Sequence, residues 1–509
     1  MKSNNEFKRS IFDKRDKYAA RRKFFRSRMR VLVPAVACCI ALCITLSTMM
    51  GVPPLSDITM SYPLSHPENI VSNWTNPAED IELEIAEINL FSLQAGREDP
   101  LAGQRGVVNL MQMEPAAQSE SYDDPFTISG EFYQHAAEFS IALFRQSVSQ
   151  GENTLVSPLS VLLALSMTAN GARGNTLSQM EQVLAGGIPI NRLNQYLHAL
   201  AGSLPSFSGS QLHIANSIWF DNGRINVLDE FLRTNGRYYG ASAYQLPFNM
   251  QAVGLINQWV ESNTHGMIDE IIDEIDESVV MYLINAIAFD ASWARPFFSH
   301  NTRTHTFHAL GGQRRNVDMM FRELLHIGGS DENLLPRFIE DDQATGFIKP
   351  YYGGNYSFAA ILPNENVDIH DYIQSLSGER FMNLMNNRQL VTMEFGLPKF
   401  SFEYDLEMSQ VLSNLGMTNA FTDTHADFNG IGTSPLGNIY INRVLHKTFI
   451  EVDEEGTRAA AVTAVEMAAQ SVPPPPGQTV ILDRPFVFAI IDNTTNLPIF
   501  IGSVMDIGD

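Results

Sequence analysis

Three closely spaced histidines, His300, His305 and His308, are the nearest approach in this sequence to a metal-binding pattern. Their spacing fits no strong zinc motif, and no set of acidic partners lies beside them. The chain also has no Gly-x-Ser-x-Gly elbow, no His-Glu-x-x-His helix and no glycine-rich loop ending in Gly-Lys-Ser/Thr. We therefore expect no catalytic residue, no metal site and no cofactor, and the sequence does not favour an enzyme.

A different kind of chemistry is open to the segment Glu454–Pro476, EEGTRAAAVTAVEMAAQSVPPPP. Between Thr457 and Ala468 its only charged residues are Arg458 and Glu466, which are eight apart and therefore share one face of a β-strand. The opposite face is uncharged and mostly small, so a sheet could bury it without desolvating a charge. The alternative is a helix, because alanine, methionine and glutamine favour one.

The charge of the chain is divided unevenly between its two ends. Residues 1–30 hold 12 Lys/Arg and 3 Asp/Glu, and the formal net charge of the whole chain is -23, so the remainder carries about -32. Such an acidic body repels polyphosphate, and we expect no nucleic-acid binding. An apolar content of 44% in 509 residues is typical of a large globular core.

An uncharged run, Val31–Val52, follows the basic arm directly. Its 22 residues would span about 33 Å as a helix, close to the thickness of a bilayer core. The positive-inside rule predicts a transmembrane signal-anchor over residues 31–52, with residues 1–30 cytoplasmic and the rest extracellular. A cleaved signal peptide, which would give a secreted protein, is the alternative. All three cysteines lie in this run, so the exported part has no disulfide and no thiol nucleophile.

Two further regions follow the predicted anchor. Residues 53–127 contain 13 Asp/Glu, 2 Lys/Arg and eight prolines, a composition that predicts an extended, mostly disordered stalk. A globular domain is expected over residues 128–509, with amphipathic helical patterns first and strand patterns dominating later. This order predicts a mixed α and β fold with a large sheet.

Individual elements of this domain are also predicted. Ser157 and Pro158 are typical of a helix start, and Asn170 with Gly171 of its end. Further helices are expected at residues 255–263 and 404–415. Strands are expected at residues 212–220, 282–289, 347–351, 356–362, 390–395, 437–452, 480–482, 486–491 and 499–504.

Several blocks of this domain, in order along about 380 residues, resemble the serpin family of peptidase inhibitors. They are NTLVSPLSV at residues 153–161, LINAIAFDASWARPF at 283–297, LPKF at 397–400, VLHKTFIEVDEEGTRAAAVTA at 444–464, and DRPFVFAII with LPIFIGSV near the C-terminus. The resemblance implies an α+β serpin fold with a large central β-sheet, further β-sheets, about eight to nine helices and an exposed reactive-centre loop at about 454–479.

The resemblance also implies which residues act. Polar groups at the middle of the central sheet, called the shutter in this family, match Ser157, Ser160, Asn285 and His446. Trp293 matches the family's tryptophan near the top of the sheet, called the breach, where a loop would enter. The loop hinge matches Glu454, Glu455, Gly456, Thr457, Arg458, Ala459, Ala460 and Ala461, with Arg458 where the family usually has an acidic residue. Counting from the hinge glycine places the reactive bond between Gln470 and Ser471.

The implied activity is suicide inhibition of a serine or cysteine peptidase by a monomer. In this family an exposed loop is cut, and its first part inserts into the central sheet while the peptidase is still acylated. The absence of Lys or Arg before the predicted cut argues against a trypsin-like target. A non-inhibitory serpin, acting as a surface binding or chaperone-like protein, is the alternative. The small residues of the hinge favour the inhibitor.

Overall fold

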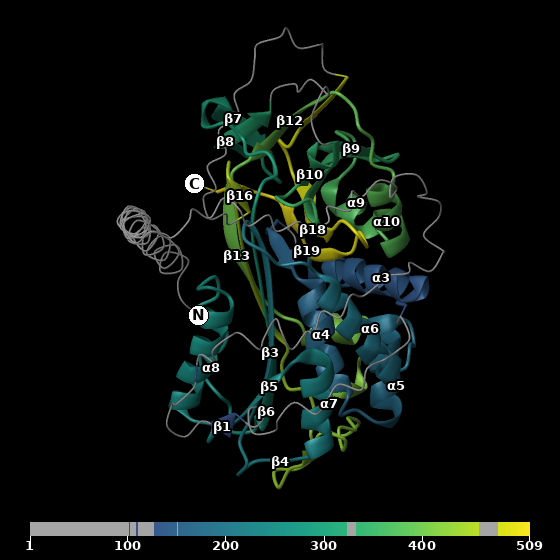
Figure 1. The fold of residues 1–509 in the computed structure, drawn as a ribbon, viewed down its shortest axis with the longest axis vertical. Helices are drawn as coiled ribbons and strands as arrows, with labels where there is room; N and C mark the ends of the chain where they lie inside the picture. The colour runs from purple at the N-terminus through teal and green to yellow at the C-terminus, as the bar shows by residue number, and fades with distance from the viewer. Residues whose placement is uncertain are drawn as a thin grey trace, which may run out of the picture. The chain divides into compact units, whose positions relative to one another are not determined.

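The structure, a computed structural model, describes residues 101, 108–109, 127–149, 151–322, 332–457 and 477–508 (Figure 1). The segment predicted to be an anchor, the hinge residues Arg458 to Ala461 and the predicted reactive bond lie outside these ranges. None of the helices within them combines the length and the apolar character that a bilayer crossing requires.

A seven-stranded sheet runs through the centre of the described domain (Figure 1). Its strands, in spatial order, are β1 (Val108–Asn109), β5 (Ser242–Gln245), β3 (Ser210–Phe220), β6 (Met281–Ser292), β16 (Gly456–Thr457), β15 (Leu445–Val452) and β13 (Phe400–Glu407). β3 and β6 pair antiparallel along the whole length of β3. The short strand β1 comes from the region predicted to be a stalk, and it forms one edge of the sheet.

The remaining strands of the described residues form two larger sheets and one small one. The six-stranded sheet contains β2 (Thr154–Val156), β19 (Pro498–Val504), β18 (Phe486–Asp492), β11 (Tyr356–Pro363), β10 (Ala344–Pro350) and β9 (Arg337–Glu340). The four-stranded sheet contains β17 (Gln478–Ile481), β12 (Met393–Pro398), β8 (Arg314–Arg322) and β7 (Thr302–His308). β14 (Gly432–Thr433) pairs with β4 (Asn226–Val227).

Helices lie on both sides of the central sheet (Figure 1). The α-helices of the described residues are α3 (Gly130–Ser147), α4 (Pro158–Ala169), α5 (Gly174–Ala185), α6 (Ile190–Ser203), α7 (Asp229–Tyr239), α8 (Met250–Asn263), α9 (Ile369–Ser375), α10 (Gly378–Asn386) and α11 (Ser409–Asn414). Short 3-10 turns are η3 (Ser299–Asn301), η4 (Glu332–Leu334) and η5 (Asn419–Phe421). α4 begins as predicted, since the Ser157 side chain accepts from the Ser160 amide and Pro158 occupies the first turn.

The central sheet separates two hydrophobic cores. On β6, Ile287 and Phe289 belong to the larger core, which also contains residues of α3 and α4. The alternate residues Ala286 and Ala288 belong to a smaller core under α8. Because successive side chains of a strand point to opposite faces, this alternation assigns a face to every position of β6.

The helix predicted at residues 404–415 is wrong in its first part. Residues 404–407 belong to β13, which pairs antiparallel with β15, and only Ser409–Asn414 form a helix. Phe402, Tyr404 and Leu406 alternate with acidic residues in this stretch, which is the period of a strand. Pairing with β15 therefore overrides the local helical tendency.

The strand predicted at residues 437–452 is correct only in its second half. β15 starts at Leu445, where its partner β13 ends at Glu407. Residues 438–444 are irregular, and Asn438 donates hydrogen bonds to the carbonyl oxygens of Asp423 and Ala426. These residues have no partner strand among the described residues, so the ladder that would extend them does not form.

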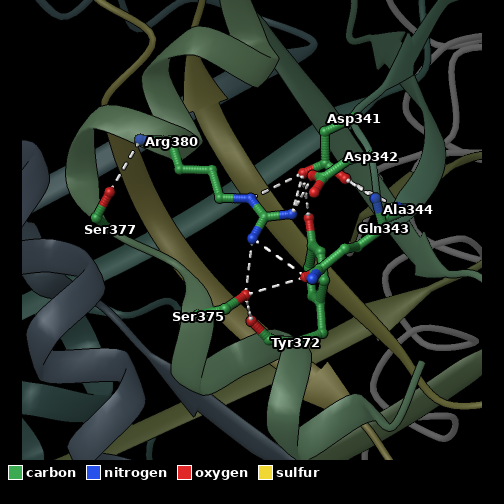
Figure 2. A network of polar contacts seen from close by, with 8 residues as sticks. All are labelled: Asp341, Asp342, Gln343, Ala344, Tyr372, Ser375, Ser377 and Arg380. Atoms are coloured by element: carbon green, nitrogen blue, oxygen red, sulfur yellow. Dashed lines mark hydrogen bonds and ion pairs between the residues drawn. The ribbon is translucent and has the colours of Figure 1, made fainter.

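A network of polar contacts joins the turn between β9 and β10 to α9 and α10 (Figure 2). The Arg380 guanidinium donates to Asp341 Oδ2 from Nε at 3.0 Å and from Nη2 at 2.9 Å, and to Ser375 Oγ at 2.8 Å. It also lies over the ring of Tyr372, 5.1 Å from the centroid. Charge-assisted bonds of this kind fix both partners, so α10 is held against the sheet.

Candidate functional site

Strand β16 occupies the seam between β6 and β15. Gly456 pairs with Ser292 and Thr457 with Ala291 on β6, while Thr457 also pairs with Val452 on β15. Below these two residues, β6 and β15 make no direct ladder with each other in the part of the chain that the structure describes. The central sheet is therefore closed at one end by the start of the predicted loop and open along the rest of the seam.

Several hydrogen bonds hold the hairpin that leads into β16. Asp453 Oδ1 accepts from the amides of Glu455 and Gly456 at 2.8 and 3.1 Å. The Glu454 carboxylate accepts from Lys399 Nζ at 2.8 Å and from Thr302 Oγ1 at 2.9 Å. Burial raises the pKa of the Glu454 carboxyl, but the hydrogen bonds from Lys399 and Thr302 outweigh it and hold the pKa below its usual value.

An aromatic platform lies beneath this hairpin. The buried indole of Trp293 stacks on Tyr351 with ring centroids 4.5 Å apart, and its Nε1 donates to the Asp453 carbonyl at 2.9 Å. The Tyr351 hydroxyl is hydrogen-bonded to Thr457 Oγ1. The buried Lys349 ammonium lies 5.0 Å from the Trp293 ring. Trp293 thus fixes the point at which the loop enters the sheet.

A cavity of about 340 Å³ lies along the open part of the seam. Its lining includes Ile284 and Asn285 from β6, Leu445 and His446 from β15, Ser160 from α4 and Val260 from α8. Both predicted shutter residues, Asn285 and His446, therefore line this cavity between the two strands. No hydrogen bond between these two side chains is present in the described structure.

His446 and Ser157 are joined directly at the floor of the seam. His446 Nε2 accepts from the Ser157 amide at 3.0 Å, so its proton lies on Nδ1. Ser157 Oγ donates to the Ile499 carbonyl at 2.8 Å and accepts from the Ser160 amide at 3.3 Å. Three of the predicted residues therefore form one network that links β15, the start of α4 and β19.

Asn285 takes part in a separate network on β6. Its Nδ2 donates to Asn216 Oδ1 at 2.8 Å, and Asn216 in turn donates to the Tyr239 carbonyl at 2.8 Å. Asn285 Oδ1 is shielded from solvent and has no hydrogen-bond partner among the described residues. A buried amide oxygen in this condition can accept a new partner that arrives in the seam.

His446 makes the stability of this region depend on pH. Burial lowers its pKa to about 4, whereas an unfolded histidine titrates near 6.5. Between these values the unfolded chain binds the extra proton, so stability falls as the pH falls. We expect His446 to account for a loss of about 2 kcal/mol in the free energy of unfolding between pH 7 and pH 5.

Urea unfolding of the wild type and of His446→Gln at both pH values measures this contribution. Glutamine retains a side-chain acceptor for the Ser157 amide but does not titrate. The difference between pH 7 and pH 5 should therefore be smaller by about 2 kcal/mol in the variant. Equal differences in the two proteins would contradict the assignment.

Comparison with known proteins identifies the fold. The family model described as Serpin (serine protease inhibitor) matches residues 134–507. The chain belongs to the serpin family. An uncharacterized serpin-like protein of Thermococcus kodakarensis is 32% identical over 72% of this chain and 84% of its own length. Human neuroserpin is 28% identical over 72% of this chain and 90% of its own.

Solved structures agree with this result. The thermophilic serpin tengpin in its native state is 44% identical, with a TM-score of 0.72 over 79% of this chain and 99% of its own. The predicted serpin fold, with mixed helices and several sheets, is confirmed. Members of the family are mostly peptidase inhibitors rather than enzymes.

Sequence reasoning missed several residues that hold this serpin's seam together. They are Asn216, Thr302, Lys349, Tyr351, Lys399 and Asp453. Lys399 stands in the LPKF block that resembles the family. Asn216 lies within the predicted strand HIANSIWF, and a buried amide in a strand signals a side-chain partner.

Proposed function

We propose that this serpin is a single-use inhibitor of serine or cysteine endopeptidases, which acts as a monomer. The peptidase cuts the loop, and the segment that follows β16 then enters the seam between β6 and β15. The observation that carries the proposal is the position of β16, because Gly456 and Thr457 already pair with β6 and Thr457 also pairs with β15, the two strands that an inserted segment would join.

The open seam supplies hydrogen bonds for an inserted strand. β6 extends from Met281 to Ser292, so ten of its residues lie beyond the pairs made by β16. New ladder bonds contribute about 0.5 to 1.5 kcal/mol each, so filling the seam yields on the order of ten kcal/mol. This gain makes the inserted state more stable than the open one. The peptidase is trapped when insertion is faster than hydrolysis of the acyl-enzyme.

The pairing register supports the predicted orientation of the inserted segment. In an antiparallel ladder the numbers of opposed residues have a constant sum, so an inserted segment that continued the pairs of β16 would bring Thr463 opposite Asn285 and His446. Its side chain would share a face with Thr457, whose side chain is buried against Tyr351. A threonine hydroxyl there can donate to Asn285 Oδ1, the oxygen that has no partner in the described structure.

The chemistry of trapping is ordinary acyl transfer by the target. The nucleophile of the peptidase attacks the Gln470 carbonyl, the bond to Ser471 breaks, and the new Ser471 amine leaves as the acyl-enzyme forms. Ala468 and Ala469 precede the predicted bond, so peptidases that accept small or uncharged residues fit better than trypsin-like ones.

The test is to mix the full-length chain with elastase-like, subtilisin-like and papain-like peptidases. We expect a complex that survives boiling in detergent with at least one of them, with the loop cut near Gln470 as mapped by mass spectrometry. A catalytically inactive form of the same peptidase is the control and should form no such complex. Complete turnover of the loop by every active enzyme, without a complex, would favour the non-inhibitory alternative.

We also propose that residues 31–52 anchor this serpin in a membrane, with its domain outside the cell. The support is the uncharged run that follows 12 Lys/Arg in residues 1–30. We expect the chain to stay in the membrane fraction after an alkaline wash, with residues 1–30 still attached. Recovery of a soluble chain that lacks residues 1–30 would show instead that the segment is a cleaved signal peptide.

A further inference from the structure

The cavity along the seam has a largely apolar lining that the described residues cover only in part. On β6 this lining includes seven consecutive residues, Met281–Ile287, which correspond to about 20 Å of strand. Leu436 and Tyr440, two exposed large apolar side chains, also border the cavity. Its volume of about 340 Å³ falls within the range of about 300 to 1,000 Å³ that is typical of small-molecule sites. A ligand can therefore cover this apolar surface.

The charged side chains of the lining are cationic. Arg443 and Lys447 border the cavity, whereas no Asp or Glu among the described residues does. His446 also borders it and is neutral at pH 7, because burial lowers its pKa to about 4. The whole chain has a formal net charge of -23, so the cavity has the opposite sign from the molecule. An anionic group is the complement of this lining.

Both cations lie on the α8 side of the sheet. Lys447 shares a face of β15 with Leu445, which packs against the core under α8, and Lys447 Nζ donates to the Glu270 carbonyl at 2.9 Å. Arg443 lies beside Tyr282, which packs against the same core. Arg443 is exposed, and the Lys447 ammonium has two further N–H donors. Both side chains can therefore donate to one carboxylate.

Acidic residues near these cations do not neutralise them. Asp276 attracts Arg443, but Asp276 is fully exposed, so solvent screens the attraction. Lys447 donates to the backbone carbonyl of Glu270, which carries no formal charge. An anion in the cavity therefore meets two cations whose charge is largely available.

The apolar part of a ligand would lie under α8. The lining there consists of branched aliphatic side chains, namely Val260 on α8, Ile268 and Ile271 in the segment after it, and Ile284 on β6. The cavity is long for its volume, since it follows β6 over about 20 Å. An extended hydrocarbon chain fits such a space better than a compact ring system does.

We propose that this cavity binds a medium-chain aliphatic carboxylate. The carboxylate accepts hydrogen bonds from Arg443 and Lys447, and the chain lies against the aliphatic residues under α8. The ligand occupies the space between β6 and β15, so it excludes an inserted strand. Binding itself does not depend on the proposed function, whereas this effect on insertion rests on it.

Isothermal titration calorimetry of the full-length chain with decanoate, below the concentration at which decanoate forms micelles, tests the site. Decanol and decyltrimethylammonium have the same chain with no charge and with a positive charge. We expect decanoate to bind at least about tenfold more tightly than decanol, and decyltrimethylammonium to bind most weakly. Each methylene removed from decanoate should weaken binding about fourfold. No saturable binding of decanoate, or equal binding of decanol, overturns the proposal.

Three variants locate the bound decanoate. Arg443→Gln and Lys447→Gln should each weaken decanoate binding at least about fivefold and leave decanol binding unchanged. Arg314→Gln removes the same charge at an exposed position of β8 and should bind decanoate as the wild type does. Non-specific adsorption to apolar segments would not distinguish Arg443 from Arg314. Equal losses in these two variants, or no loss in Arg443→Gln, would show that the inference is wrong.

Trapping of a peptidase measures the effect on insertion. At ten times the dissociation constant of decanoate, about one molecule in eleven has an empty seam, so insertion slows about tenfold. The number of inhibitor molecules consumed per peptidase trapped should rise at least about threefold, and less in Arg443→Gln at the same concentration. After the loop is cut and inserted, decanoate binding should be lost. Trapping that saturating decanoate does not change would show that the ligand lies outside the seam.

The outcomes distinguish this inference from the proposed function. If decanoate binds with the expected charge dependence but no peptidase is trapped, the site stands and the inhibitory function is wrong. If decanoate binds the intact and the cut chain equally, the cut segment does not fill the seam, and the insertion mechanism is wrong. If a peptidase is trapped but decanoate does not bind, only this inference is wrong.

Discussion

Replacing Ala461 with proline is expected to convert this serpin from an inhibitor into a substrate. An inserted segment that continued the register of β16 would bring position 461 opposite Ile287 on β6 and Thr448 on β15, in the middle of the seam. Proline there removes a ladder donor, and central strands exclude it for this reason. Cleavage of the loop should remain normal, while the cut segment fails to insert in time.

The size of this effect follows from competition between insertion and hydrolysis of the acyl-enzyme. A lost and unsatisfied hydrogen bond raises the insertion barrier by about 2 kcal/mol, which slows insertion about 30-fold. The measurement is the number of inhibitor molecules consumed per peptidase trapped. Ala461→Ser is the matched control, because it retains the backbone donor and a small side chain. Undiminished trapping by Ala461→Pro would mean that this segment does not insert.

Replacing Trp293 with alanine is expected to lower the free energy of unfolding by about 3 to 5 kcal/mol. Its indole is only 1% exposed, stacks on Tyr351 and donates to the Asp453 carbonyl. The variant loses this packing and leaves the carbonyl without its donor. It also removes an aromatic neighbour from the buried Lys349, and a buried cation is costly without its partners.

Chemical unfolding of the intact chain measures this loss. Trp293→Phe is the matched variant, since it keeps an aromatic ring against Tyr351 but lacks the indole N–H. It should lose about 1 to 2 kcal/mol, the value of the hydrogen bond and of the carbonyl left behind. A Trp293→Ala protein as stable as the wild type would show that the platform does not hold the hairpin.

Local signals in the sequence were sufficient for some elements of this fold. Ser157, Pro158 and Asn170 mark the limits of α4 because capping depends only on neighbouring residues. The apolar runs of β11, β18 and β19 likewise predict strands, because strands that are buried on both faces are apolar throughout. The resemblance then supplied the order in which these elements belong together.

Pairing between distant segments was not accessible in the same way. β13 was predicted as the start of a helix because the alternation of Phe402, Tyr404 and Leu406 competes with a helical pattern that continues into α11. Nothing in the local sequence indicates that Trp293 binds the carbonyl of Asp453, 160 residues away. Such contacts form only when distant strands come together in the central sheet. They hold the end of the seam at which β16 lies.

The hairpin that seats Gly456 and Thr457 also determines how the loop competes with free peptides. Since these two residues already lie in the sheet, the next residue joins by an intramolecular step. A short flexible link of this kind corresponds to an effective concentration on the order of millimolar. A separate peptide with the sequence of the loop must therefore reach about that concentration before it can occupy the seam first.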